Sequence, residues 1–450
     1  MRNNILLKER ALKLIHRLRG QIIDPGLCSR HRRREQDFSR ECRLTFPVLV
    51  ILLLQKSLKS LQARLHEYMR GLALGTESNS LSVGAVTHAR AKLSAEVFVD
   101  LNRQAVLPTL YGDETKELVQ RWRGHRLLGV DSSVIRLPKN QDVAKKYGWM
   151  ECSYEHVLAE RYPQGRMSVL YDLLNEVAVD ANLAPWKEAE EHMAQAHMEW
   201  VEPGDIIITD RGYTSYLWVW SVLAKGAHFV SRCSGSSFGI ARNLLKKDRA
   251  GLSVVATLTI NKELKTKVLE WGLPLEVKVR FVTVRLKTGE LEVLITSLLD
   301  EEAYPTEDFA ALYWRRWGQE TFYARLKGRM DLENCSGLTL DAVEQDFAAT
   351  VLLSNVESAV AGPAVAQLTE RTSHRKQPAK INRAVSLHAL KTRLIDLLTS
   401  SVPAEQVLTE LTQWFQHNPV SIRILREVPR LNPSHARSYH YQRHVKKIVF

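Results

Sequence analysis

Apolar residues recur every three or four positions along the first part of the chain, and this spacing predicts a mainly helical N-terminal domain over residues 1–120. The clearest stretch is VLVILLLQKSLKSLQARLHEYM, residues 48–69. The longest apolar run, Phe46 to Leu54, is too short to span a bilayer and is typical of a buried helix. We therefore expect packed helices at the start of the chain and no membrane as a partner.

A pair of short helices is predicted over residues 79–104, NSLSVGAVTHARAKLSAEVFVDLNRQ. Serines suited to helix N-caps precede each of them: Ser80 or Ser82 before the first and Ser94 before the second. The pair is compatible with a helix-turn-helix-like unit whose Arg90 and Lys92 face DNA phosphates, and equally with a plain helical pair in a small domain. A basic run, RHRRREQ at residues 30–36, is compatible with a solvated loop or with a phosphate contact.

Short apolar runs that alternate with helical segments begin near residue 121 and predict an α/β domain, with a first part over residues 121–235. Leu127–Val130 predicts a strand that ends at Asp131, and Ile206–Ile208 predicts a buried strand that leads into Asp210. Between and after these strands we predict a turn at Leu174–Asn175, a polar-faced helix at 186–200, and a helix, a stop at Gly226 and a strand within 216–233.

Residues 236–305 are rich in alternating apolar positions and predict a β-rich insertion within the α/β domain. Lys287-Thr288-Gly289 suits a hairpin turn there. Residues 306–365 then return to the α/β domain with a long helix, and residues 366–450 predict a helical C-terminal region that ends in a basic tail.

The charge balance of the 450-residue chain favours a polyanionic partner. Lys and Arg number 63 against 50 Asp and Glu, a net charge of +13, and the sequence pI is about 9.5. Nucleic acid is the usual partner of such a chain, although the same balance also occurs in a merely basic soluble protein.

The cysteines indicate the cellular compartment, and the absence of common motifs in the sequence indicates which cofactors are not expected. The five cysteines are scattered and odd in number, which favours a reducing, cytoplasmic environment over disulfides or a zinc cluster. No GxxxxGK[ST] motif occurs, so we expect no nucleotide cofactor. His192 and His197 lack HExxH spacing, and we expect them to be solvated rather than zinc ligands.

The stretch YWRRWGQETFYARLK places Tyr313, Arg316, Glu320 and Lys327 on one stripe of the predicted long helix. At about 100° per residue these positions fall within roughly 60° of one another. A stripe that faces a core is apolar, so this stripe faces either water or a charged partner. The ordinary alternative for Arg316 and Glu320 is a surface salt bridge at i,i+4 spacing.

Three acids become a candidate site if the fold brings them together. Asp131 and Asp210 follow predicted strands, and the carboxyl ends of strands are where α/β folds place their sites. Glu320 lies on the later helix. Three converging carboxylates require cations, and their oxygens suit two Mg²⁺ or Mn²⁺ ions that assist phosphoryl transfer. Taken singly, an Asp after a strand is more often a turn or cap residue.

These residues carry a family resemblance. Tyr313, Arg316, Glu320 and Lys327 match Y-x2-R-x3-E-x6-K, the YREK signature of DDE transposases of bacterial insertion sequences, specifically the insertion sequence 4 family. Three further blocks resemble that family: AVTHARAKLSAEVF, GVDSSVIRLP and ITDRGY. The resemblance covers roughly residues 45–395. It implies an RNase H-like catalytic core interrupted by a β-rich insertion, which fits the segment predicted at 236–305.

The resemblance also implies roles for single residues. Asp131, Asp210 and Glu320 would form the metal-binding catalytic triad, while Tyr313, Arg316 and Lys327 would hold terminal phosphates of the element. Members of the family cut through a DNA hairpin with an aromatic residue of the insertion stacked on a flipped base, and Trp271 is the one Trp in residues 236–305. Its ordinary alternative is a core or hairpin-edge Trp.

We therefore expect a transposase that binds the terminal inverted repeats of its insertion sequence, cleaves the ends and joins the 3′ ends to target DNA. Double-stranded DNA is the expected partner, and the resemblance implies a homo-oligomer on DNA in the bacterial cytoplasm. A non-catalytic DNA-binding relative and a metal-dependent nuclease without strand transfer are the alternatives.

Overall fold

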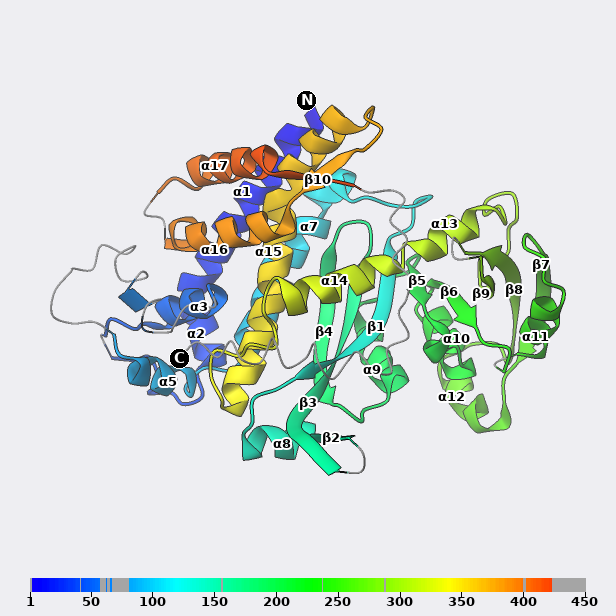
Figure 1. Ribbon diagram of the computed structural model, residues 1–450, viewed down its shortest axis with the longest axis horizontal. Coiled ribbons are helices and arrows are strands. Elements are labelled where there is room, and N and C mark those ends of the chain that lie inside the picture. The colour runs from blue at the N-terminus through cyan, green and yellow to red at the C-terminus, as the bar shows by residue number, and fades with distance from the viewer. Residues whose placement is uncertain are drawn as a thin grey trace. The chain divides into compact units, whose positions relative to one another are not determined.

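The computed structural model of the chain divides into two compact units, each described here by itself (Figure 1). The helical unit comprises Met1–Val119, Arg136–Pro163 and Arg325–Phe450, and the sheet unit comprises Gln120–Ile135 and Gln164–Ala324. The structure describes residues 2–40, 42–56, 62, 65–66, 81–154, 157–236, 238–286, 289–399 and 402–422. The predicted basic tail after residue 422 and most of the predicted helix beyond residue 56 lie outside the described residues.

The helical unit is built around one long helix, α15 (Leu340–Thr372), which contacts α1, α3, α6, α16 and α17. By length and composition α15 is able to cross a membrane, but 89% of its most apolar stretch is buried inside the protein, as in the core helix of a soluble protein. The helices of this unit are α1 (Arg2–Ile23), α2 (Pro25–His31), α3 (Phe46–Leu54), α5 (Val83–Arg90), α6 (Glu96–Leu101), α7 (Leu107–Tyr111), α8 (Gln141–Tyr147), α15, α16 (Arg383–Thr399) and α17 (Ala404–His417).

Two predictions for the helical unit are confirmed by its first helices. The apolar run Phe46–Leu54 forms α3 and is almost wholly buried. The helix pair over 79–104 is present as α5 and α6, and Ser82 caps α5 because its Oγ accepts a hydrogen bond from the N–H of Ala85 at 3.1 Å. The alternative cap, Ser80, lies outside the described residues.

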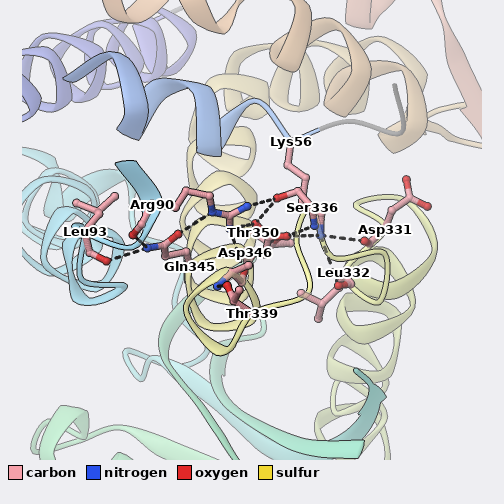
Figure 2. A network of polar contacts seen from close by, with 11 residues as sticks. Lys56, Arg90, Leu93, Asp331, Leu332, Ser336, Thr339, Gln345, Asp346 and Thr350 are labelled. Carbon is pink, nitrogen blue, oxygen red and sulfur yellow. Dashed lines mark hydrogen bonds and ion pairs between the residues drawn. The ribbon is translucent and has the colours of Figure 1, made fainter. Parts of the chain in front are cut away.

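Arg90 corrects one expectation. We predicted that Arg90 faces DNA phosphates, but its side chain is buried and its guanidinium is used inside the helical unit (Figure 2). Its Nη2 lies 2.9 Å from Oδ1 of Asp346, and its Nε donates to Oε1 of Gln345 at 2.9 Å. Lys92, two residues further on, is exposed, so its contact with phosphate stays a prediction.

Asp346 is the centre of this buried polar network. Besides Arg90, the Nζ of Lys56 lies 3.7 Å from Oδ2 of Asp346, and the hydroxyl of Ser336 donates to Oδ1 at 2.8 Å (Figure 2). One buried carboxylate thereby balances two buried cations that come from segments far apart in the sequence. Buried charges are tolerated only when they are paired and hydrogen-bonded, so these segments are held together as one unit.

The sheet unit is organised around a large mixed sheet with the strand order β3-β1-β5-β6-β9-β8-β7 and with β4 beside β3 (Figure 1). β1, β5 and β6 are parallel to one another, whereas β9, β8, β7 and the β3–β4 hairpin are antiparallel. The strand bounds are β1 (Leu127–Arg136), β3 (Val157–Asp172), β4 (Val177–Pro185), β5 (Ile206–Thr209), β6 (His228–Cys233), β7 (Ser253–Thr259), β8 (Glu276–Arg285) and β9 (Leu291–Thr296). β2 (Trp149–Tyr154) pairs with the first half of β3 within the helical unit.

The predicted β-rich segment 236–305 contains β7, β8 and β9, and it extends the main sheet instead of forming a sheet of its own. β9 pairs antiparallel with β6, and β8 pairs with β9 on its other side. Two of the residues predicted to form the hairpin turn, Lys287 and Thr288, lie outside the described residues. The predicted turn at Leu174–Asn175 joins β3 to β4.

Helices cover both faces of the sheet. Ile206 and Ile208 pack with α13 (Asp308–Trp314) on one face, in a core cluster that includes Phe309 of that helix. On the other face the ring of Phe281 lies 5.7 Å from that of Phe238, the residue before α11 (Gly239–Lys246). The side chains of consecutive strand residues point to opposite faces, so every second residue along β1, β5 and β6 faces α13. The fold is therefore a mixed α/β sandwich around one sheet.

The predicted long helix is broken, which is a second correction. It forms α13 and α14 (Trp317–Gly328), and Arg315 and Arg316 form a turn between them. The predicted end of the first strand also differs, because β1 continues to Arg136 and Asp131 lies in its middle. A periodicity argument treats each stretch as a continuous element, so it misses a turn inserted into a helix.

Gly129 allows α14 to approach β1 closely. A Cβ built on Gly129 would collide with Oε1 of the buried Gln319 and would lie 3.1 Å from Cδ2 of Leu173. Gln319 is one residue before Glu320, and its Nε2 donates to the carbonyl of Val169 at 2.7 Å. The missing side chain of one glycine therefore sets how closely the helix that bears Glu320 packs on the sheet.

We predict that Gly129→Ala destabilises the protein by about 1–3 kcal/mol, the usual cost of overpacking a well-packed interior. Chemical denaturation monitored by tryptophan fluorescence measures this difference. Gly239→Ala is the matched control, because a Cβ on Gly239 meets nothing within 4 Å. Equal stability of the two variants would contradict the close approach of α14 to β1.

Candidate active site

Asp131 and Asp210 lie beside each other because of the register of the sheet. Gly129 of β1 pairs with Ile208 of β5, so continuing the parallel register by two residues brings Asp131 level with Asp210. Each aspartate is an even number of residues from strand residues that face α13, so its side chain points to the same face. Neighbouring strands are about 4.8 Å apart. Two carboxylates therefore face the same side of the sheet, toward the turn between α13 and α14.

Asp131 is the more buried and less easily ionised of the two acids. Its Oδ1 accepts a hydrogen bond from the N–H of Ser132 at 2.8 Å. The pKa of Asp131 is raised to about 6, mainly by burial and less by the charges of Glu190 and Glu320, while the N–H of Ser132 and the guanidinium of Arg316 act in the opposite direction. A carboxyl in this position is stabilised by any additional cation.

Asp210 has the opposite electrostatic environment. Its Oδ1 accepts hydrogen bonds from the N–H of Arg211 at 2.7 Å and from Nε of Arg232 at 2.6 Å. Burial alone would raise the pKa of Asp210, but these two donors and the charge of Arg316 outweigh burial and lower it. The two aspartates thus differ in how readily they lose a proton, although they lie at the same level of the sheet.

Arg316 lies between the acids. Its Nη2 donates to Oε1 of Glu320 at 2.9 Å, and its Nη1 lies 4.0 Å from Oδ2 of Asp131. Its charge also acts on Asp210, whose Oδ1 accepts a hydrogen bond from the hydroxyl of Tyr313 at 3.3 Å. Tyr313 and Arg316 are both buried. Tyr313 and Arg316 of the polar stripe therefore lie against carboxylates, and the Arg316–Glu320 salt bridge is buried at its arginine end, while 39% of the Glu320 side chain is exposed.

The three carboxylates are suitable ligands for a divalent cation, but in this structure they are too far apart to share one. Carboxylate oxygens are the ligands that Mg²⁺ and Mn²⁺ prefer, and the charge of Glu320 adds a small part to the raised pKa of Asp131, which burial mainly causes. Among the described residues, no three His, Cys, Asp or Glu side chains are grouped closely enough to hold a metal ion. The guanidinium of Arg316 provides positive charge between the acids.

Lys327 and Trp271 are the remaining predicted residues. Lys327 is in the last turn of α14, in the part of that helix assigned to the helical unit, where burial lowers its pKa against the charge of Glu333. Trp271 follows α12 (Lys265–Glu270) and is half-buried, with Nζ of Lys267 5.2 Å from its ring. The roles of Lys327 and Trp271 stay predictions.

Several residues that contact the acids were not predicted from the sequence. Arg232 is beside Asp210 because Thr209 pairs with Ser231, and its Nη1 donates to Oε1 of Glu292 at 2.6 Å. On the other side, the hydroxyl of Ser132 donates to Oε1 of Glu190 at 2.8 Å. The pairing of strands, which a single sequence does not reveal, is the only signal for Arg232.

The expectation that His197 is solvated is wrong. His197 is fully buried, with its Nδ1 2.7 Å from Oδ2 of Asp180 and its Nε2 2.9 Å from Oγ of Ser168. It lies in a short 3₁₀ turn, His197–Trp200, that follows α9 (Glu190–Ala196), whereas His192 is exposed as predicted. A helix that looked polar on the whole therefore turns its last residues inward.

Comparisons with known proteins identify the family and related transposases. Residues 122–356 match the family model of the transposase DDE domain. The chain is 26% identical over 351 residues to "Transposase InsG for insertion sequence element IS4" of Escherichia coli (strain K12), which covers 75% of this chain and 74% of that protein. It is 27% identical over 137 residues to "Putative transposase InsZ" of the same organism, covering 30% and 44% of the two chains.

A solved structure, the piggyBac transposase synaptic complex with hairpin DNA, aligns with a TM-score of 0.42 at 10% identity, covering 95% of this chain and 86% of that chain. The family match is the decisive finding, because it spans more than half of the chain. The chain belongs to the DDE transposase family. Within that family it is a transposase of the insertion sequence 4 type, as the YREK signature indicates.

Proposed function

We propose that this transposase binds the terminal inverted repeats of its own insertion sequence, cleaves the DNA ends and transfers the 3′ ends to target DNA. Asp131, Asp210 and Glu320 are the catalytic acids. The observation that supports this most strongly is that these acids come from three separate elements of the sheet unit and gather around one guanidinium, that of Arg316.

Divalent ions, two Mg²⁺ or Mn²⁺ held by these acids, would supply Lewis-acid stabilisation of the attacking and leaving oxygens. The protein's own residues hold and orient the DNA. Asp131 and Asp210 are fixed by backbone N–H groups, so their carboxylates are oriented before DNA arrives. Tyr313, Arg316 and Lys327 bind terminal phosphates, and a homo-oligomer brings two ends together in the bacterial cytoplasm.

A labelled DNA end tests this proposal directly. The full chain is incubated with a double-stranded oligonucleotide that carries the inverted repeat, with and without Mg²⁺. Ion-dependent cleavage followed by joining to a target duplex supports the transposase. Cleavage without joining would favour the nuclease, and binding without cleavage in either condition would favour the non-catalytic DNA-binding relative.

Lys327→Ala provides a prediction for end binding. Removal of one phosphate contact weakens binding and reduces the slope of log K against log salt by about one. Fluorescence anisotropy with a labelled end at several salt concentrations measures the slope. Lys116→Ala is the matched control, because Lys116 is largely exposed and its partner is the neighbouring Asp113. An unchanged slope for Lys327→Ala would remove Lys327 from the phosphate contacts.

A further inference from the structure

Arg316 is unusual among the arginines of the site because it is buried and incompletely hydrogen-bonded. It is 5% exposed, and within the described part of the chain its Nε finds no hydrogen-bond acceptor. Its Nη1 is 4.0 Å from Asp131, which is an ion-pair distance and too long for a hydrogen bond. A buried donor without an acceptor costs free energy, so a partner with more acceptor oxygens, such as a phosphate, would bind this guanidinium more strongly.

The position of Arg316 also bears on the cations that the proposed function requires. Its charge acts on Asp131, Asp210 and Glu320 together, and these are the same three carboxylates. A divalent ion shared by them would lie within a few ångströms of the guanidinium and would be repelled by it. The guanidinium and the divalent ions therefore compete for the same carboxylates.

Arg316 lies in a turn and close to two aromatic rings. Arg316 is in the turn between α13 and α14, and the following Trp317 begins α14. The rings of Tyr313 and Trp317 lie 5.6 and 5.3 Å from its guanidinium carbon. Cation–π contacts are less directional than hydrogen bonds, so they leave a planar cation freer to reorient.

We propose that Arg316 is an internal counter-cation that keeps divalent ions weakly bound until a DNA phosphate draws it away from the acids. This inference rests on the proposed function and adds its regulation: DNA ends and divalent ions bind cooperatively because both depend on the position of one guanidinium. In the free transposase the guanidinium of Arg316 neutralises part of the charge of the acids without a metal ion. The divalent ions then bind fully only when the protein is at a DNA end. By linkage, the ion tightens DNA binding by the same factor as DNA tightens ion binding.

Mn²⁺ binding, followed by electron paramagnetic resonance on the full chain, tests this proposal without measuring activity. In the wild type, adding an inverted-repeat duplex is expected to tighten Mn²⁺ binding by roughly tenfold or more. Arg316→Met is expected to bind Mn²⁺ without DNA about as tightly as the wild type does with DNA, and to lose the effect of DNA. The double variant Asp131→Asn, Asp210→Asn provides the blank for Mn²⁺ held by the DNA alone.

The matched control is Arg315→Met, since Arg315 is adjacent and exposed and should behave as the wild type. Arg316→Gln repeats the test with a polar side chain, and circular dichroism verifies folding of each variant. Equal Mn²⁺ affinity of wild type and Arg316→Met without DNA, or an effect of DNA that persists in Arg316→Met, would overturn the inference and leave the proposed function intact. Mn²⁺ binding that never depends on Asp131 and Asp210 would instead overturn the proposed metal site.

Discussion

Glu320→Gln is expected to leave binding of the DNA end intact and to reduce strand cleavage by more than about a hundredfold, the loss that can follow even from disturbing the partners of metal ligands. Glutamine has the same shape as glutamate and retains an oxygen that accepts from Nη2 of Arg316, so α14 should keep its place. What disappears is a negative charge beside Asp131. Without that charge the acids attract divalent ions less strongly.

Single-turnover cleavage of a labelled end, with anisotropy for binding, separates the two effects. Glu405→Gln is the matched control, because Glu405 is exposed on α17 in the helical unit. We expect it to cleave as the wild type does. If Glu320→Gln retained most of the cleavage rate, Glu320 would not be one of the catalytic acids.

Asp346→Asn is expected to destabilise the protein by about 3–5 kcal/mol, the usual cost of removing one partner of a buried ion pair. Asparagine leaves Arg90 and Lys56 buried without their counter-charge. Denaturant unfolding measures the loss, with the exposed Asp113→Asn as the matched control. An Asp346→Asn variant as stable as Asp113→Asn would show that the network contributes little.

The same carboxylate predicts how stability depends on pH. Burial alone would raise the pKa of Asp346, but Arg90, Lys56 and Ser336 together lower it below its ordinary value. A lowered pKa in the folded state stabilises the protein above the unfolded pKa, near 4, and this stability is lost as the pH falls through the folded value. Wild type should therefore lose stability below about pH 4 more steeply than Asp346→Asn, and parallel curves would contradict this.

The three candidate acids could be proposed from the sequence because the patterns that mark them are local. Asp131 follows an apolar run directly, Asp210 follows another after one threonine, and Arg316 and Glu320 occur at fixed spacing in one motif. Arg232 was not accessible, because only the pairing of β5 with β6 makes it a neighbour of Asp210. The same reasoning applies to Gly129, whose importance depends on a helix nearly two hundred residues away.

Arg90 was assigned to DNA from the sequence, but the structure uses it inside the protein. A basic residue near the end of a short helix resembles a phosphate contact as long as its surroundings are unknown. Its partner Asp346 lies 256 positions later, on the apolar helix α15, where a buried carboxylate is not expected from the pattern. Local charge patterns therefore do not reveal which of the basic residues are used inside the helical unit.

The central claim is that Asp131, Asp210 and Glu320 hold divalent ions at a DNA end, and iron-directed cleavage tests it most directly. Fe²⁺ replaces Mg²⁺ in the complex of the full chain with an inverted-repeat duplex, and ascorbate with peroxide then generates radicals that cut the protein backbone beside the bound ion. The account predicts cuts next to all three acids, suppressed by excess Mg²⁺. Cuts elsewhere only, from a complex that still cleaves its DNA end with Mg²⁺, would contradict it.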